Sequence, residues 1–216
     1  MRISDIPTIY INLTKRPDRD EHIRKELTKL GIDSPVRCNA IETDNGAIGC
    51  SLSHIKCLKM AIEADYDYVL ICEDDLEVTN TKACIYNINK FLNNTSNVWD
   101  VALIAGNNMQ PYQYINKHCI KISHCFAATG YIVRKSYYDT LLNHYKEGVT
   151  QLMREPNNHA YRIDVYWMIL QRAHNWVMVI PPTIVQKENY SNIENRVTNY
   201  HWLMLNYDKS NGRTSS

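Results

Sequence analysis

YVLICEDDLEV, residues 68 to 78, places an apolar run directly before three adjacent carboxylates, those of Glu73, Asp74 and Asp75. The apolar run predicts a buried strand whose end reaches solvent at the edge of a sheet. Three clustered negative charges repel one another unless a cation offsets them, and hard oxygen ligands suit Mg²⁺ or Mn²⁺. The stretch therefore predicts a cation site, with a solvated acidic turn as the simpler alternative.

Strand-like and helix-like patterns alternate on both sides of this stretch. Strand patterns fall at 8–13, 36–41, 68–72, 101–105 and 176–180. Helix patterns fall at 17–30, 48–62, 81–92, 135–145 and 164–173. CFAATGYIV, residues 125 to 133, reads as strand, turn, strand. The alternation predicts an α/β fold, with a single Rossmann-like domain whose mainly parallel sheet is covered by helices.

Length and composition restrict the class of protein. The 216 residues fit one domain, expected at 1–205 and followed by a disordered tail at 206–216. A net charge of +1 gives no general attraction to nucleic acid or to an anionic membrane. No segment has the apolar length of a membrane span and the N-terminus lacks an export signal, so we expect a cytoplasmic protein. Seven cysteines without CxxC spacing indicate reduced thiols.

The three carboxylates are expected to divide between two sides of the strand. Side chains alternate on an extended strand, which puts Glu73 and Asp75 on one side and Asp74 on the other. We therefore expect Asp75 as the main metal ligand, Glu73 as its helper, and Asp74 directed toward a ribose or a sugar. This division holds only if the strand stays extended through Asp75.

Six segments, in this order, carry a resemblance to a known family. They are IYINLTKRPDR (9–19), GAIGCSLSHIKCL (46–58), VLICEDDLEV (69–78), ATGYIV (128–133), RIDVYWM (162–168), and PPTIVQ with YSNIE (181–194). Together they resemble glycosyltransferase family 25, which includes bacterial lipo-oligosaccharide galactosyltransferases, collagen hydroxylysine glycosyltransferases and viral relatives. The resemblance implies a GT-A type nucleotide-sugar fold, a UDP-sugar donor, Mn²⁺ or Mg²⁺ as cofactor, and inversion at the anomeric carbon.

The resemblance also assigns roles in the first half of the chain. Asn12, Arg16 and Arg19 lie where the family places its nucleotide contacts, although both arginines also suit an exposed first helical turn. Gly49 permits close ligand approach, and Ser53 and His54 follow on the first turns of a helix whose N-terminus attracts anions. A lone histidine is, however, more often a structural residue than a ligand.

Later segments supply further candidates. Thr129, Gly130 and Tyr131 are expected in a wall of the sugar pocket, with Tyr131 stacking on the pyranose ring. The alternative is a core strand in which the glycine allows close packing. His201 is a candidate late metal ligand by position, with a C-terminal helix residue as the alternative, and Asn192 stands where the family more often has aspartate.

Asp164, in RIDVYWM, is the expected general base. The resemblance places a carboxylate here, and the proton of the acceptor otherwise has no obvious recipient. The competing explanation is a helix N-cap, because aspartate is favoured at that position.

The activity expected is transfer of galactose or glucose, from UDP-galactose or UDP-glucose, to a hydroxyl of a glycan or of hydroxylysine. The corresponding processes are lipopolysaccharide biosynthesis and collagen glycosylation, in the host cytoplasm if the chain is viral. A homodimer is one expected assembly. Two other classes remain open: a catalytically silent module that binds a sugar nucleotide or glycan, and a glycoside hydrolase, which requires two facing carboxylates.

Overall fold

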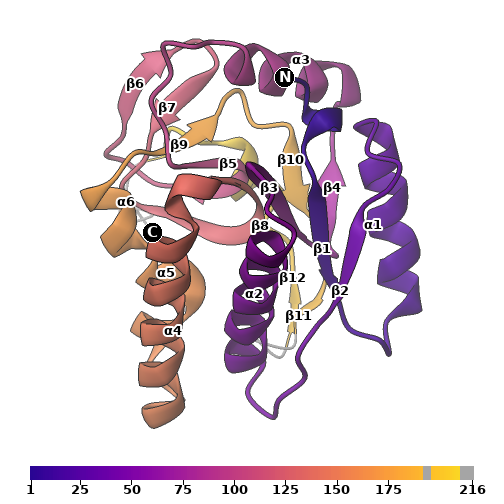
Figure 1. Ribbon diagram of the computed structural model, residues 1–216, viewed down its shortest axis with the longest axis vertical. Coiled ribbons are helices and arrows are strands. Elements are labelled where there is room, and N and C mark those ends of the chain that lie inside the picture. The colour runs from indigo at the N-terminus through magenta and orange to yellow at the C-terminus, as the bar shows by residue number, and fades with distance from the viewer. Residues whose placement is uncertain (192–195, 210–216) are drawn as a thin grey trace, which may run out of the picture.

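The computed structural model describes residues 1–191 and 196–209. Within these ranges, side chains are described for residues 1–188 and 199–209. Its centre is an eight-stranded sheet with the order β2-β1-β3-β8-β5-β9-β7-β6 (Figure 1). These strands are β1 (Thr8–Asn12), β2 (Val36–Asn39), β3 (Tyr68–Glu73), β5 (Val101–Asn108), β6 (Gln113–Asn116), β7 (Cys119–Lys121), β8 (Cys125–Arg134) and β9 (Trp176–Val179). Two small pairs lie outside it: β4 (Leu76–Val78) with β10 (Ile184–Gln186), and β11 (Asn189–Ser191) with β12 (Arg196–Thr198).

Helices connect these strands. They are α1 (Pro17–Lys29), α2 (Gly46–Glu63), α3 (Thr81–Leu92), α4 (Tyr138–Arg154), α5 (Ile163–Tyr166), α6 (Met168–Ala173) and α7 (His201–Leu205), with short 3₁₀ turns η1 (Ile3–Asp5), η2 (Lys135–Tyr137) and η3 (His159–Tyr161). Local sequence explains several of their ends. Pro17 occupies the first turn of α1, and the side chain of Asn45 accepts hydrogen bonds from the first amides of α2.

Most strands of the sheet run in one direction. The pairings of β1 with β2 and β3, and of β5 with β9, are parallel. Strand β8 is antiparallel to both β3 and β5, and β7 is antiparallel to β6 and β9. Six strands therefore point the same way and β8 and β7 point the other way. The predicted α/β fold with a mainly parallel, helix-covered sheet is confirmed, and the two reversed strands were not expected.

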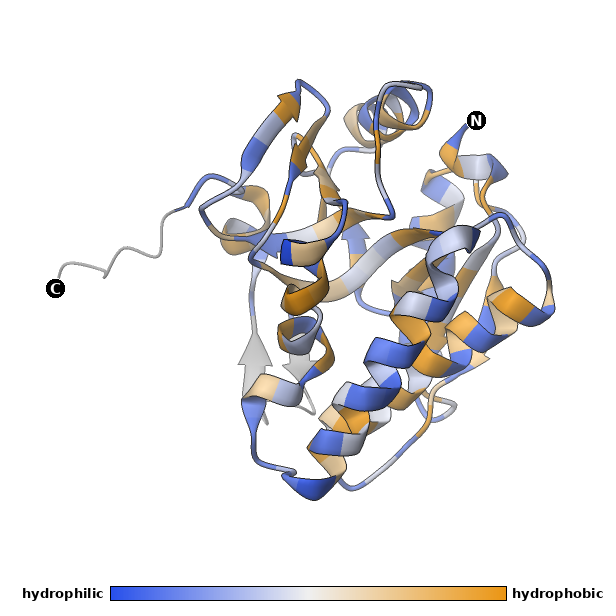
Figure 2. Cartoon of the chain, turned by 60° about the vertical axis from the view of Figure 1, so that its left-hand side comes forward, coloured by the Kyte–Doolittle hydropathy of each residue, from blue (hydrophilic) through white to orange (hydrophobic). Residues whose placement is uncertain are grey.

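Both faces of the sheet are buried under helices. Ile9, Ile11 and Ile71 face the core that contains α2 and α4, whereas Tyr10 and Leu70 face the core that contains α1 and α3. This two-residue period is that of a strand with two covered faces. The helices carry hydrophobic residues beside hydrophilic ones, as amphipathic covering helices do (Figure 2).

The second half of the chain differs from the prediction in two places. Residues 125–133 were expected as strand, turn, strand, and this was wrong because β8 runs without a break to Arg134. It absorbs an irregularity instead: Ala127 has φ +69°, and the register with β5 shifts between Leu103 and Asn107. The helix expected at 164–173 is two short helices, α5 and α6, which meet at the buried Trp167.

The packed domain extends beyond residue 205. The side-chain amide of Asn108, at the end of β5, donates to the carbonyl of Tyr207 at 2.9 Å, and the amide of Gln110 donates to the carbonyl of Lys209 at 3.0 Å. Lys209 is only 8 % exposed, and its ammonium group donates to three carbonyls. The part of the predicted tail at 210–216 lies outside the described residues, as does Asn192.

Strand direction brings chemically active side chains to one edge of the sheet. The carboxyl ends of β1, β3 and β5 carry Asn12, Glu73 and Asn108. Because β8 is reversed, its beginning, around Phe126, lies at the same edge as the end of β5. Among the described residues, no helix is long and apolar enough to cross a membrane.

Candidate active site

The strand of the acidic stretch ends at Glu73, and Asp74 and Asp75 form the turn into β4. Asp74 is 8 % exposed and accepts hydrogen bonds from Asn12 Nδ2 at 2.8 Å and from the Arg19 guanidinium at 2.9 Å. Burial raises the pKa of Asp74, while Arg19 and Asn12 act in the opposite direction. Asp74 is thus engaged by protein groups, and the predicted alternation fails because the backbone turns after Glu73.

Asp75 has the environment that a cation would complete. Its Oδ2 accepts a hydrogen bond from Gln186 Nε2 at 2.9 Å, and the Arg19 guanidinium lies 3.8 Å from the same oxygen. Its Oδ1 is buried and has no hydrogen-bond partner within the described part of the chain. Burial, together with Glu73 and Asp74, raises the pKa of Asp75 to about 7. An orphaned carboxylate oxygen beside two further carboxylates fits a hard divalent cation.

Glu73 is held from the side of α2. Its Oε1 accepts a hydrogen bond from the Cys50 thiol at 3.5 Å and lies 3.2 Å from Nε2 of His54. Burial alone would raise the pKa of Glu73, but the contacts with His54 and Cys50 and the charge of Arg19 outweigh it and lower the pKa. Glu73 therefore ionises more readily than an ordinary glutamate, whereas Asp74 and Asp75 ionise less readily than an ordinary aspartate.

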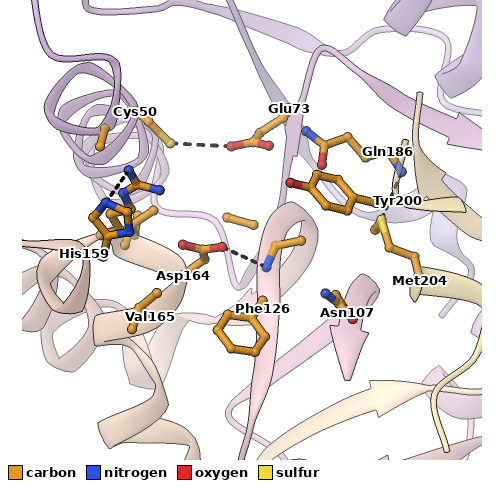
Figure 3. A pocket seen from close by; sticks show the side chains of 15 residues that line it. Cys50, Glu73, Asn107, Phe126, His159, Asp164, Val165, Gln186, Tyr200 and Met204 are labelled. Atoms are coloured by element: carbon orange, nitrogen blue, oxygen red, sulfur yellow. Dashed lines mark hydrogen bonds between the residues drawn. The ribbon is translucent and has the colours of Figure 1, made fainter. Parts of the chain in front are cut away.

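A cavity of about 380 Å³ opens beside Glu73. Figure 3 shows the side chains that line it. Its walls come from α2, the ends of β3 and β5, the start of β8, the segment from η3 to α5, β10 and α7. The lining residues are Ala47, Cys50, Glu73, Asn107, Phe126, Ala127, Ala128, His159, Arg162, Ile163, Asp164, Val165, Gln186, Tyr200, Met204. The cavity thus combines apolar walls with two carboxylates, an arginine and several neutral polar groups, which is typical of a small-ligand site.

Asp164 lines the same cavity as Glu73, on a different wall (Figure 3). Its Oδ2 accepts a hydrogen bond from the amide of Ala127 at 3.2 Å. Burial raises the pKa of Asp164; the Ala127 amide opposes this rise and the charge of Glu73 adds to it. The N-cap of α5 is Arg162, so Asp164 lies inside the first turn and its carboxylate reaches across to β8. The helix-cap explanation therefore does not describe this side chain.

Several predicted ligand contacts are buried inside the protein. Ser53 is 1 % exposed and its hydroxyl accepts from the amide of Ile41 and donates to the carbonyl of Gly49. A Cβ added at Gly49 would lie 2.6 Å from the carbonyl oxygen of Ile41, so this glycine serves packing against the preceding loop. His54 is fully buried between Glu73 and the hydroxyl of Tyr131. In this structure these three residues lie in the protein interior and hold neighbouring parts of the site in place.

The ATGYIV segment belongs to the core of β8. Thr129 and Tyr131 are fully buried, and a Cβ at Gly130 would meet Leu76 Cδ1 at 3.1 Å. The Tyr131 ring stacks on His54 with 5.7 Å between ring centroids. The expected stacking of Tyr131 on a sugar ring is therefore corrected, because its ring has no face open to a ligand. Its role is to hold His54.

The first-strand candidates form a separate polar cluster. Asn12 is 1 % exposed and bridges Asp74 and the backbone carbonyl of Arg16, while its own Oδ1 accepts from Arg37 at 2.6 Å. Arg19 joins the same cluster through Asp74. Arg16 instead pairs with Asp18 through two hydrogen bonds of 2.7 and 2.9 Å. Asn12 and Arg19 thus order the acidic turn, and Arg16 lies beside it.

His201 begins α7 and its Nε2 lies 3.1 Å from Glu77 Oε2, so it is paired away from Asp75 in this structure. Cys50, Arg162 and Tyr200 also line the cavity, although the sequence patterns do not predict them as site residues. Cys50 and Arg162 lie inside two of the segments that resemble the family, so the sequence did carry a signal for them. Tyr200 carried none, because only tertiary packing of α7 brings it to the cavity.

The mixed sheet with its covering helices has the GT-A type fold. A model of glycosyltransferase family 25, described as an LPS biosynthesis protein, matches residues 42–155, more than half of the sequence. The chain belongs to glycosyltransferase family 25.

Solved structures agree with the fold. A glycosyltransferase involved in the glycosylation of the major capsid of PBCV-1 aligns with TM-score 0.55 and 12% identity, over 88% of this chain and 96% of that chain. Two further structures align with lower scores. One is a mannose-1-phosphate geranyltransferase from Thermus thermophilus, with TM-score 0.45 and 8% identity over 84% of this chain and 74% of that chain. The other is a Drosophila β1,4-galactosyltransferase 7 variant in complex with manganese, UDP-Gal and xylobiose, with TM-score 0.38 and 11% identity over 90% of this chain and 71% of that chain. No curated protein matches the sequence.

Proposed function

We propose that this chain is a metal-dependent, inverting hexosyltransferase that moves galactose or glucose from a UDP-sugar to an acceptor hydroxyl. The observation that carries the proposal is Asp164: a carboxylate with a raised pKa lines the cavity together with Glu73, the residue that precedes the acidic turn. A base on one wall and a cation-binding turn at another side are the two parts that direct displacement requires.

Asp75 would hold the cation through its unpartnered Oδ1, with Glu73 as the helping ligand. A bound Mn²⁺ or Mg²⁺ supplies positive charge that stabilises the leaving diphosphate. Gln186 contacts Asp75 and also lines the cavity, so it connects the acidic turn to the space that the sugar would occupy. Arg162 also lines the cavity and would add a positive charge to that of the cation. Its Nη2 lies 3.3 Å from Nε2 of His159.

Asp164 would accept the proton of the attacking hydroxyl. Its bond from the Ala127 amide holds the carboxylate at the wall of the cavity, where an acceptor hydroxyl would bind. Burial raises its pKa toward the working pH, which suits a general base. The acceptor class that we propose is a glycan hydroxyl or a hydroxylysine-type side chain, in a cytoplasmic setting and with a homodimer as one assembly.

Release of UDP from a panel of UDP-sugars, with Mn²⁺ and with chelator, tests the proposal. Slow hydrolysis by water reports the donor even when no acceptor is supplied. We expect release from UDP-galactose or UDP-glucose that requires the metal. Metal-dependent UDP binding without turnover on any donor and acceptor would instead indicate the silent binding module. Release from GDP- or CMP-sugars alone would contradict the donor assignment.

A further inference from the structure

Cys50, His54 and Glu73 bring three different metal-binding atoms together beside the cavity. Cys50 and His54 are four residues apart on α2 and so share one face of the helix, and Glu73 ends β3 opposite them. The thiol sulfur, an imidazole nitrogen and a carboxylate oxygen all lie within 4.8 Å of one another. No step of the proposed transfer uses the thiol.

Two of the three distances between these atoms match those of a tetrahedral site. Zinc bonds of about 2.0 Å to nitrogen and oxygen and about 2.3 Å to sulfur place neighbouring ligand atoms roughly 3.3 to 3.5 Å apart. The distance from Cys50 Sγ to Glu73 Oε1 is 3.5 Å, and that from His54 Nε2 to the same oxygen is 3.2 Å. A cation could therefore replace the thiol proton with little movement of the three side chains.

The surroundings supply the other parts of such a site. Nδ1 of His54 lies 2.9 Å from the Tyr131 hydroxyl, and the two rings stack, so the imidazole is fixed with Nε2 directed at Glu73. Metal-binding histidines are commonly oriented in this way by a partner on the other ring nitrogen. Cys50 and Glu73 both line the cavity, which leaves an open position for water or a ligand atom.

We infer that Cys50, His54 and Glu73 form a second cation site, for a thiophilic divalent ion such as Zn²⁺, distinct from the hard-cation position at Asp75. The chemistry of the ligands separates the two. A thiolate and an imidazole select Zn²⁺ or Co²⁺, whereas the carboxylates of the acidic turn suit Mg²⁺ or Mn²⁺. Binding at Sγ displaces the thiol proton to solvent, and binding at Nε2 places the imidazole proton on Nδ1, where it is donated to the Tyr131 hydroxyl. Because a proton is released, affinity rises with pH. The inference does not depend on the proposed function, although Glu73 belongs to both sites.

Titration of the metal-free chain with Co²⁺ tests this inference. We expect one equivalent to produce the near-ultraviolet absorption of a cobalt–thiolate bond, and stoichiometric Zn²⁺ to remove it. Cys50→Ser should lose the thiolate band while keeping a hydrogen-bond donor for Glu73. Cys72→Ala is the matched control, because Cys72 precedes Glu73 but its thiol lies in the other core; it should keep the band. Melting curves of each variant show that it is folded.

A third variant separates this site from that of the proposed transferase. Asp75→Asn should keep the cobalt–thiolate band and lose Mn²⁺-dependent UDP binding. Loss of both signals in this folded variant would overturn the claim of two distinct positions. Absence of the band in the wild-type chain, or its persistence in Cys50→Ser, would overturn the site itself. A wild-type chain that shows the band but binds no UDP would contradict only the nucleotide-sugar proposal.

Discussion

A single substitution at Asp164 can separate its structural role, accepting a backbone hydrogen bond, from its proposed chemical role, accepting a proton. Its carboxylate accepts the Ala127 amide, which an asparagine oxygen can also do, but asparagine cannot take up a proton. We expect Asp164→Asn to reduce turnover by about 10²–10⁴-fold, the usual effect of losing a general base. Its melting temperature and affinity for UDP should stay close to those of the wild type. Normal turnover would exclude Asp164 as the base and direct attention to Glu73.

The titration of Asp75 predicts how stability depends on pH without metal. Its pKa is about 7 in the folded chain against a reference value of 3.8, so between these pH values the folded state holds a proton that the unfolded state has lost. This contribution to the free energy of unfolding is fully present below pH 3.8 and is lost as the pH rises through about 7.

Asp75→Asn removes that titration. In chelator, the variant should become more stable relative to the wild type as the pH rises from about 5 to about 8, because only the wild type acquires the buried charge. Denaturant unfolding of both proteins across this range measures the difference. Parallel stability curves would show that Asp75 does not titrate in this way.

At the scale of elements, the contact between α2 and the loop before it depends on one glycine. A methyl group at position 49 would meet the backbone oxygen of Ile41 at 2.6 Å, and backbone cannot move aside as a long side chain can. We expect Gly49→Ala to cost about 1–3 kcal/mol, as overpacking typically does. Ile62→Ala, on an exposed position of the same helix, should change stability by less than about 0.5 kcal/mol. Urea unfolding compares the two, and equal effects would contradict the packing role.

Sequence patterns located elements well where one local rule was sufficient. Strand β3 followed from an apolar run, and helix α1 begins where Pro17 fits the first turn. Strand β8 was misread because the unusual backbone of Ala127 is stabilised by long-range neighbours, including Asp164. The same holds for the acidic turn: the rule of alternating side chains applies only while pairing continues, and pairing stops at Glu73.

At the scale of the whole molecule, Lys209 links the end of the described chain to the sheet. Its ammonium group donates to the carbonyls of Leu203 and Asn206, near the C-terminus of α7, and of Asn108 on β5. Helix α7 carries Met204, which lines the cavity. Lys209→Met leaves buried carbonyls without their donor, which costs about 1–3 kcal/mol for such a group.

We therefore expect Lys209→Met to lower stability and to raise the KM for the donor more than it lowers kcat. Lys146→Met, at an exposed position of α4, is the control and should change neither. Thermal unfolding and donor kinetics check both variants. An unchanged KM in a destabilised Lys209 variant would mean that the lysine holds the fold without shaping the cavity.

The site as a whole was only partly predictable. The rule that ligands bind beyond strand ends identified Glu73, and the family resemblance identified Asp164, and both line the cavity. For His54 and Tyr131 the sequence left a ligand contact and a structural role both open, because residue type alone does not tell whether a polar side chain faces a ligand or another polar side chain. Met204 lies on a short helix and Tyr200 directly precedes it, and the place of this helix is set by long-range packing.

The strand order has a consequence for how the protein acquires its binding capacity. Strands β3, β8 and β5 are neighbours in the sheet although some fifty residues separate β3 from β8 along the chain, so their pairing closes long loops and is expected to be slow. The cavity draws on residues from Ala47 to Met204 and cannot exist in a fragment that lacks either end of this span. Ligand affinity therefore reports complete folding, because a refolding molecule can bind ligand only after the last long-range contacts have formed. Saturating ligand should accordingly raise the unfolding temperature of the entire domain.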